Sequence, residues 1–150
     1  LEKASDQIVA KLIRLLLLTG ARKSELLYSR WQDLDWRSQT LVIPLSKSGK
    51  PRYIFLSDAA MLIFEDLWDR SQSTYIFGRV GEDGPLRNLG RAWQRIREEV
   101  GLGDVRLHDL RHSYASFLIG QGRSLFEVQK LLGHAHAKTT MKYAHLRISN

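Results

Sequence analysis

The chain is organised around one C-terminal stretch, which contains LHDLRHSYAS (107–116), LLGH (131–134) and TTMKYAH (139–145). At about 100° per residue, a helix over the first segment carries a polar stripe of His108, Arg111, His112 and Ala115. A second, apolar stripe lies roughly a third of a turn away and contains Leu110, Tyr114, Phe117 and Leu118. We therefore expect this helix to bury the apolar stripe and to present an imidazole and a guanidinium on the other.

Length and composition indicate a single domain with its own core. The chain has 150 residues, of which 43% are hydrophobic, and such a domain needs no covalent staples. It contains no Cys, which excludes disulfides and thiolate metal sites and suits a reducing cytosol. The longest apolar run, Leu15 to Leu18, is too short to cross a bilayer, and no signal peptide is recognisable. No membrane partner is therefore expected.

The charge balance favours a polyanionic partner. The formal net charge is +7, with 23 Lys and Arg residues, which is typical of proteins that bind nucleic acid. A generic solvated basic surface is the alternative interpretation of the same numbers.

Hydrophobic periodicity and capping residues predict a mainly α fold with one small antiparallel β-sheet. The first helix is expected to start at Ser5 or Asp6 and to end before Gly20, with Leu17 and Leu18 also buried. Further helices are expected at about 22–29, 58–69 (capped by Ser57), 85–100, 108 to 120 or 122, 124–133 and 138–145. The helix at 58–69 is expected to offer Met61, Leu62, Phe64, Leu67 and Trp68 to the core.

A β-hairpin is expected where two β-branched runs flank a turn. The runs are 41–45 and 53–56, the turn is SKSGKP (46–51), and Lys47 and Lys50 lie near its tip. Such lysines are either solubilising or able to swing into a site formed elsewhere. Residues 31–36 are expected to form a polar, aromatic turn.

Other charged residues are compatible with a purely structural role. Arg22 lies three residues before Glu25, which is compatible with a simple surface ion pair. Arg87, Arg91 and Arg95 recur every four residues and would form a ridge, for DNA-backbone contact or as a solvated face.

Five segments in order then resemble the catalytic domain of the tyrosine recombinases, or phage integrases. They are TGARKSE with WQDLD (19–25, 31–35), KSGKPR (47–52), HDLRH (108–112), LLGH (131–134), and Tyr143, nine residues after His134. The resemblance spans nearly the whole chain and implies the fold of that domain. It also implies that residues 1–150 are a C-terminal catalytic domain whose N-terminal core-binding domain is absent from this sequence.

The resemblance implies a role for each site residue. Tyr143 would attack the scissile phosphate and form a 3′-phosphotyrosine, which conserves the bond energy so that no ATP, metal or other cofactor is needed. Because a phenol has a pKa of about 10, His108 would accept its proton. Arg22 and Arg111 would clamp the phosphate oxygens and His134 would add a donor. Glu25 would orient Arg22.

The general acid that protonates the leaving 5′-oxygen is expected to be Lys47, with Lys50 as the alternative because the register of the hairpin is open. The residues expected to contact the DNA backbone are Lys50, Arg52, Arg87, Arg91 and Arg95. His108 and His112 are spaced like a metal pair, but the chain lacks Cys and the His-Glu-x-x-His motif, so no metal is expected. His112 is expected to make a structural hydrogen bond, and His136 and His145 to be supporting residues.

The implied function is site-specific DNA recombination or integration, as in phages and mobile elements. The partners would be double-stranded DNA at a recombination site and, in the full-length protein, further protomers in a tetramer on DNA. The implied location is the cytoplasm, on the nucleoid, of a bacterium or its phage. Two alternatives are a type IB topoisomerase, which a plasmid-relaxation assay without a recombination site would identify, and a non-catalytic DNA-binding module.

Overall fold

A computed structural model describes residues 2–47, 49–79 and 81–133, with side chains from residue 6 onward. The helices are α1 (Glu2–Thr19), α2 (Lys23–Leu27), α3 (Asp58–Arg70), α4 (Leu89–Glu99), α5 (Leu107–Gly120) and α6 (Leu125–Leu132). The strands β1 (Leu34–Asp35), β2 (Thr40–Ile43) and β3 (Arg52–Phe55) form an antiparallel sheet in the order β1-β2-β3. The expected mainly α fold with a small antiparallel sheet is confirmed.

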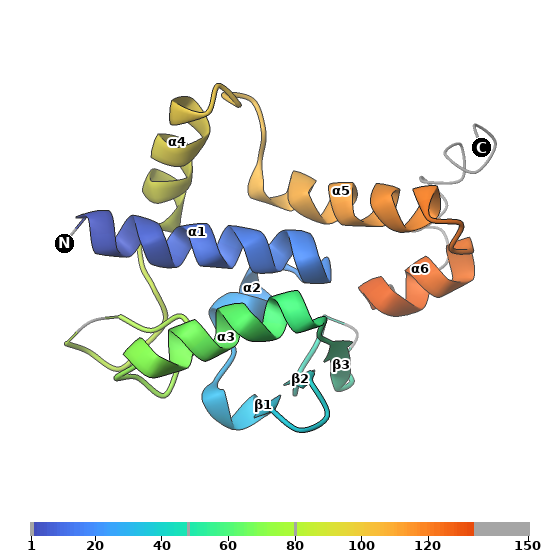
Figure 1. The fold of residues 1–150 in the computed structure, drawn as a ribbon, viewed down its shortest axis with the longest axis horizontal. Helices are drawn as coiled ribbons and strands as arrows, with labels where there is room; N and C mark the ends of the chain where they lie inside the picture. Colours follow the sequence, from blue (N-terminus) through green and yellow to red (C-terminus); the bar gives the residue numbers. More distant parts are fainter. Residues whose placement is uncertain (1, 48, 80, 134–150) are drawn as a thin grey trace.

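Helix α1 runs through the middle of the molecule, with α3 and the sheet on one side and α4 and α5 on the other (Figure 1). It begins at Glu2, so the expected start at Ser5 or Asp6 is wrong and both residues lie inside the helix. Leu17 and Leu18, expected in the core, are 43% and 37% exposed because neighbouring elements do not surround the last turn. Gly20 follows the helix in the left-handed region, at φ +67°, as expected.

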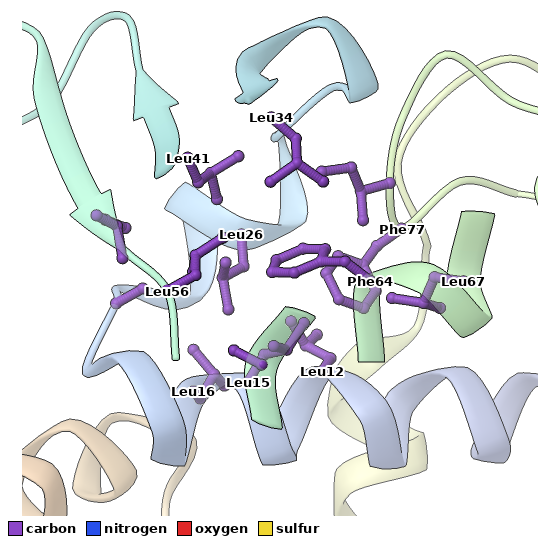
Figure 2. Close-up of a cluster of buried hydrophobic side chains, with 14 of the residues drawn as sticks. Leu12, Leu15, Leu16, Leu26, Leu34, Leu41, Leu56, Phe64, Leu67 and Phe77 are labelled. Atoms are coloured by element: carbon purple, nitrogen blue, oxygen red, sulfur yellow. The ribbon is translucent and has the colours of Figure 1, made fainter. Parts of the chain in front are cut away.

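The main core lies between α1, α2, α3 and the sheet (Figure 2). Its fully buried side chains include Leu12 and Leu15 from α1 and Phe64 from α3. Helix α3 starts where predicted, because the Ser57 hydroxyl accepts a hydrogen bond from the Ala60 amide.

Two side chains of α3 that were expected in the core lie at the surface. Leu62 is 65% exposed and Trp68 is 53% exposed. Trp68 packs edge-to-face on Trp31, with ring centroids 5.0 Å apart, and Trp31 stacks on Trp36. The segment expected as a polar, aromatic turn holds a 3-10 helix (Trp31–Asp33) and strand β1. Its Trp31 ring packs on Trp68, near the end of α3.

The predicted hairpin is formed by β2 and β3, with Leu41 opposite Ile54 and Ile43 opposite Arg52. Its turn is closed by the Ser46 hydroxyl and amide, which both donate to the Lys50 carbonyl at 2.5 and 3.2 Å. Lys47 and Lys50 thus lie near the tip of the hairpin, and both are exposed.

Helix α4 is shorter than predicted. It begins at Leu89 rather than near Pro85, after Asn88 in the left-handed region at φ +59°. Arg87 consequently lies outside the helix, and the predicted ridge of three arginines on one helix face is wrong.

Helices α5 and α6 pack on each other around a second apolar cluster of Ala115, Leu118, Ile119, Val128 and Leu132. Helix α5 ends at Gly120, as predicted, whereas Phe117, expected on its buried stripe, is 61% exposed. Helix α6 begins as predicted, because the Ser124 hydroxyl accepts from the Glu127 amide, and it ends at Gly133 with φ +69°. The predicted helix at 138–145 lies outside the described residues.

Candidate active site

Arg22 and Glu25 are held together at the start of α2. Arg22 is the residue that precedes the helix, and its amide donates to Glu25 Oε1 at 2.8 Å. Glu25 Oε2 lies 3.6 Å from Arg22 Nη1, which makes an ion pair but not a hydrogen bond. Glu25 is buried, so this carboxylate is a fixed partner of Arg22 and not a solvated surface charge.

One nitrogen of the Arg22 guanidinium, the buried Nη1, has no hydrogen bond to the described residues. Desolvation by burial lowers the pKa of Arg22 from its ordinary value; the Glu25 carboxylate opposes that shift, and the positive charge of Arg52 adds to it. A buried donor without an acceptor is costly, so an incoming anion would find a prepared partner here.

A cleft of about 670 Å³ opens beside this pair, and both Arg22 and Lys47 line it. Its wall also includes Glu25, Tyr28, Arg30 and Ser46. Lys50 lines a different hollow, together with Arg52, Phe126 and Gly133. The turn of the hairpin therefore directs its two lysines to different surfaces, and Lys47 shares one with Arg22.

Arg111 does not lie on a presented stripe as the helix pattern predicted. It is 4% exposed, and Ala115 on the same stripe is fully buried, because α5 packs against both α1 and α6. Arg111 Nη1 donates to the Gly20 carbonyl at 2.6 Å, and Nη2 donates to the Leu132 carbonyl. The guanidinium thus joins the segment before Arg22 to the end of α6.

His108 occupies the first turn of α5 and is exposed, as expected. Its ring contacts the His112 ring edge-to-face, with centroids 4.9 Å apart. Over the residues that the structure describes, no group of three or more His, Cys, Asp or Glu side chains could hold a metal ion.

Arg52, expected to contact the DNA backbone, is 7% exposed, so its side chain is buried in this structure and does not lie at the surface. Its guanidinium donates to Glu25 Oε1 at 2.5 Å and to the Leu131 carbonyl at 2.8 Å. One signal could have revealed this burial: residues 52, 54 and 56 share one face of an alternating strand, and Ile54 and Leu56 are apolar.

Of the other backbone candidates, Arg87 and Arg91 are exposed. Arg95 Nη2 lies 2.7 Å from Asp6 Oδ1, in an exposed ion pair between α4 and α1. None of these three arginines is among the described residues that line the cleft.

Some expected site residues lie outside the described residues, namely His134, His136, Tyr143 and His145. Where helices are described, none is both long and apolar enough to cross a membrane. The described part of the site therefore has Arg22, Glu25 and Lys47 at one cleft, which His108 does not line. The buried Arg52 pairs with Glu25, and the buried Arg111 donates to the Gly20 carbonyl.

Comparison with known proteins identifies the class to which this fold and site belong. The phage integrase family matches residues 1–149, and the chain belongs to that family. The tyrosine recombinase XerA of Saccharolobus solfataricus is 35% identical over 149 residues, which are 97% of this chain and 47% of that protein. XerC of Xanthomonas campestris is 36% identical over 141 residues, covering 90% of this chain and 43% of that protein. The chain thus spans about half the length of these relatives.

Solved structures show the same fold. The crystal structure of XerA recombinase has a TM-score of 0.75 at 22% identity and covers 95% of this chain and 58% of that one. XerH recombinase, in a post-cleavage complex with a palindromic difH substrate, has a TM-score of 0.78 at 24% identity, over 94% of this chain and 43% of that one. The fold expected from the sequence resemblance is confirmed as that of the tyrosine recombinases.

Proposed function

We propose that this chain is the catalytic domain of a site-specific DNA recombinase or integrase that cleaves and rejoins strands through Tyr143. The observation that carries the proposal is the buried Arg22 Nη1 donor, which has no hydrogen bond to the described residues and lies beside a cleft that Lys47 also lines. A scissile phosphate supplies the oxygen acceptors that a guanidinium fork fits. The family relationship supports the same assignment.

The proposed reaction is a phosphoryl transfer without metal or ATP. The Tyr143 oxygen forms a bond to phosphorus while the bond from phosphorus to the 5′-oxygen breaks. His108 accepts the phenolic proton, and Lys47 donates a proton to the departing 5′-oxygen. Arg22, Arg111 and His134 stabilise the charge that develops on the non-bridging oxygens.

The choice of Lys47 as the acid rests on its place in the Arg22 cleft, since Lys50 lines another hollow. The Arg111 side chain holds two backbone carbonyls in this structure. Contact with the phosphate would require it to share or exchange these acceptors.

The proposed partner is double-stranded DNA, in line with the difH complex of XerH and the core-site complex of lambda integrase. Further protomers of the complete protein would assemble on the same DNA. The proposed setting is the nucleoid of a bacterium or a phage-infected cell.

The test uses the complete protein and a nicked suicide duplex that carries a candidate core site, in EDTA and without ATP. We expect a covalent protein–DNA adduct with the wild type and none with Tyr143→Phe. Tyr114→Phe is the matched control, because it removes a hydroxyl from a tyrosine on α5, and it should form the adduct normally. An adduct with Tyr143→Phe, or none with the wild type on any candidate site, would contradict the proposal.

Arg22→Lys keeps the positive charge but removes the planar fork. Because one transition-state donor is worth about 10²–10³ in rate, we expect a slowing of that size for single-turnover cleavage. Relaxation of a supercoiled plasmid without a core site would instead favour the topoisomerase alternative.

A further inference from the structure

We propose that Arg52 is a positioning residue. It pairs with one oxygen of the Glu25 carboxylate and thereby keeps the Arg22 guanidinium available to the phosphate. The inference rests on the proposed function, because it concerns the same phosphate site. Arg52 itself is buried and lies behind Glu25, so it acts through Arg22 and not by contact with DNA.

The division of the carboxylate is visible in the distances. Glu25 Oε1 accepts from Arg52 Nη1 at 2.5 Å and from the Arg22 amide at 2.8 Å. Only Oε2 faces the Arg22 side chain, at 3.6 Å from Nη1, and this oxygen has no hydrogen bond within the described residues. Glu25 therefore orients Arg22 without forming the two-point pair that arginine and carboxylate prefer.

The charges lead to the same conclusion. Two buried or half-buried guanidinium groups share one carboxylate, so the cluster keeps a net positive charge. If Arg52 were absent, Arg22 would be the nearest cation to Glu25, and a buried carboxylate needs a charged partner. The carboxylate would then turn both oxygens to Arg22 and occupy the donors that the phosphate requires.

Arg52 also connects this cluster to two other parts of the site. It is the first residue of β3 and pairs with Ile43, so it lies at the end of the hairpin next to the turn that carries Lys47. Its Nη2 donates to the Leu131 carbonyl at 2.8 Å, beside the Leu132 carbonyl that Arg111 holds. Arg52 and Arg111 thus donate hydrogen bonds to consecutive carbonyls at the C-terminal end of α6, which lies two residues before His134 in the sequence.

The contact between Arg52 and the end of α6 also explains why residue 133 is a glycine. A Cβ on Gly133 would lie 2.6 Å from Arg52 Cδ and Nε, so any larger residue would displace the guanidinium. Gly133→Ala should therefore disturb the Arg52 arrangement without removing any charge.

The experiment compares the complete wild-type protein with Arg52→Met, Glu25→Gln and the double variant. Arg70→Met is the matched control, since Arg70 is 65% exposed and pairs with Asp66, and neither residue lines the cleft. We measure the single-turnover cleavage rate constant at saturating suicide duplex, the Kd for the same duplex, and Tm. A rate constant reports the folded molecules, so a lower Tm does not by itself change it.

We expect Arg52→Met to slow cleavage by about 100-fold, the scale of one lost transition-state donor. The Kd should change by less than threefold, because Arg52 is buried. The decisive result is the double variant: removing the carboxylate that would capture Arg22 should make it about tenfold faster than Arg52→Met, a coupling within the usual range for contacting residues.

Two outcomes would overturn the inference. One is a double variant that is as slow as Arg52→Met or slower, which is the result of a purely structural role. The other is an Arg52→Met rate constant within twofold of both the wild type and Arg70→Met. In either case the wild type still forms the adduct, whereas failure of the proposed function would abolish adduct formation in the wild type.

Discussion

Replacement of Gly20 by Ala tests the packing that holds the first arginine segment against α5. Gly20 has φ +67°, and a Cβ built there would lie 2.6 Å from Tyr114 Cε1 and closer still to Cδ1. The left-handed conformation costs a non-glycine residue about 1–2 kcal/mol, and overpacking adds about 1–3 kcal/mol. We therefore expect Gly20→Ala to lower the free energy of unfolding by about 2–5 kcal/mol.

Gly101→Ala is the matched control. Gly101 follows α4 at φ +75°, but a Cβ there would meet no atom within 4 Å. This variant carries the conformational cost alone, about 1–2 kcal/mol. The difference between the two variants measures the steric contact with Tyr114.

The assay is urea unfolding of this chain, followed by tryptophan fluorescence, with the midpoint compared at a constant slope. Measured against Tyr114→Ala alone, Gly20→Ala should cost only the conformational part, because Tyr114→Ala removes the ring atoms that a Cβ at Gly20 would meet. Equal midpoints for Gly20→Ala and Gly101→Ala would refute the close packing of Gly20 on Tyr114. Since the Gly20 carbonyl also accepts from Arg111, the same variant should slow DNA cleavage in the complete protein.

Two further predictions concern stability. Phe64→Ala should lower the free energy of unfolding by about 3–5 kcal/mol, because the ring is fully buried. Leu62→Ala, on the exposed face of α3, should change it by no more than about 0.5 kcal/mol in the same urea assay. Similar losses for both variants would contradict the assignment of the core face. Hydrogen bonds, first from the Thr74 side chain, lower the pKa of Asp83. A lowered folded-state pKa gives stability that is present above the unfolded value of about 3.9 and is lost as the pH falls through the folded value. Asp83→Asn should therefore lower Tm at neutral pH, and the difference from the wild type, measured by circular dichroism, should vanish in strong acid; a difference that persists there would contradict the linkage.

Local chemistry made much of the architecture predictable from the sequence. The Ser57 and Ser124 caps set the starts of α3 and α6, Gly20 and Gly133 follow helices in the left-handed region, and the turn at 46–51 joins two strands. Each of these features depends on residues a few positions apart, so a short window of sequence contains the physical cause. The order of the five segments that resemble the tyrosine recombinases was likewise enough to indicate the phage integrase family.

The placement of the charged side chains was decided by contacts between distant segments. Arg52 reaches Glu25 across 27 residues and the Leu131 carbonyl across 79, and Arg111 reaches the Gly20 carbonyl across 91. Helix periodicity placed Arg111 on a stripe but could not show that this stripe faces α1. The sequence by itself therefore determined which elements form and to which family they belong. Only the tertiary structure decided which arginines are buried, because that depends on which carboxylates and carbonyls the packed elements bring within hydrogen-bonding distance.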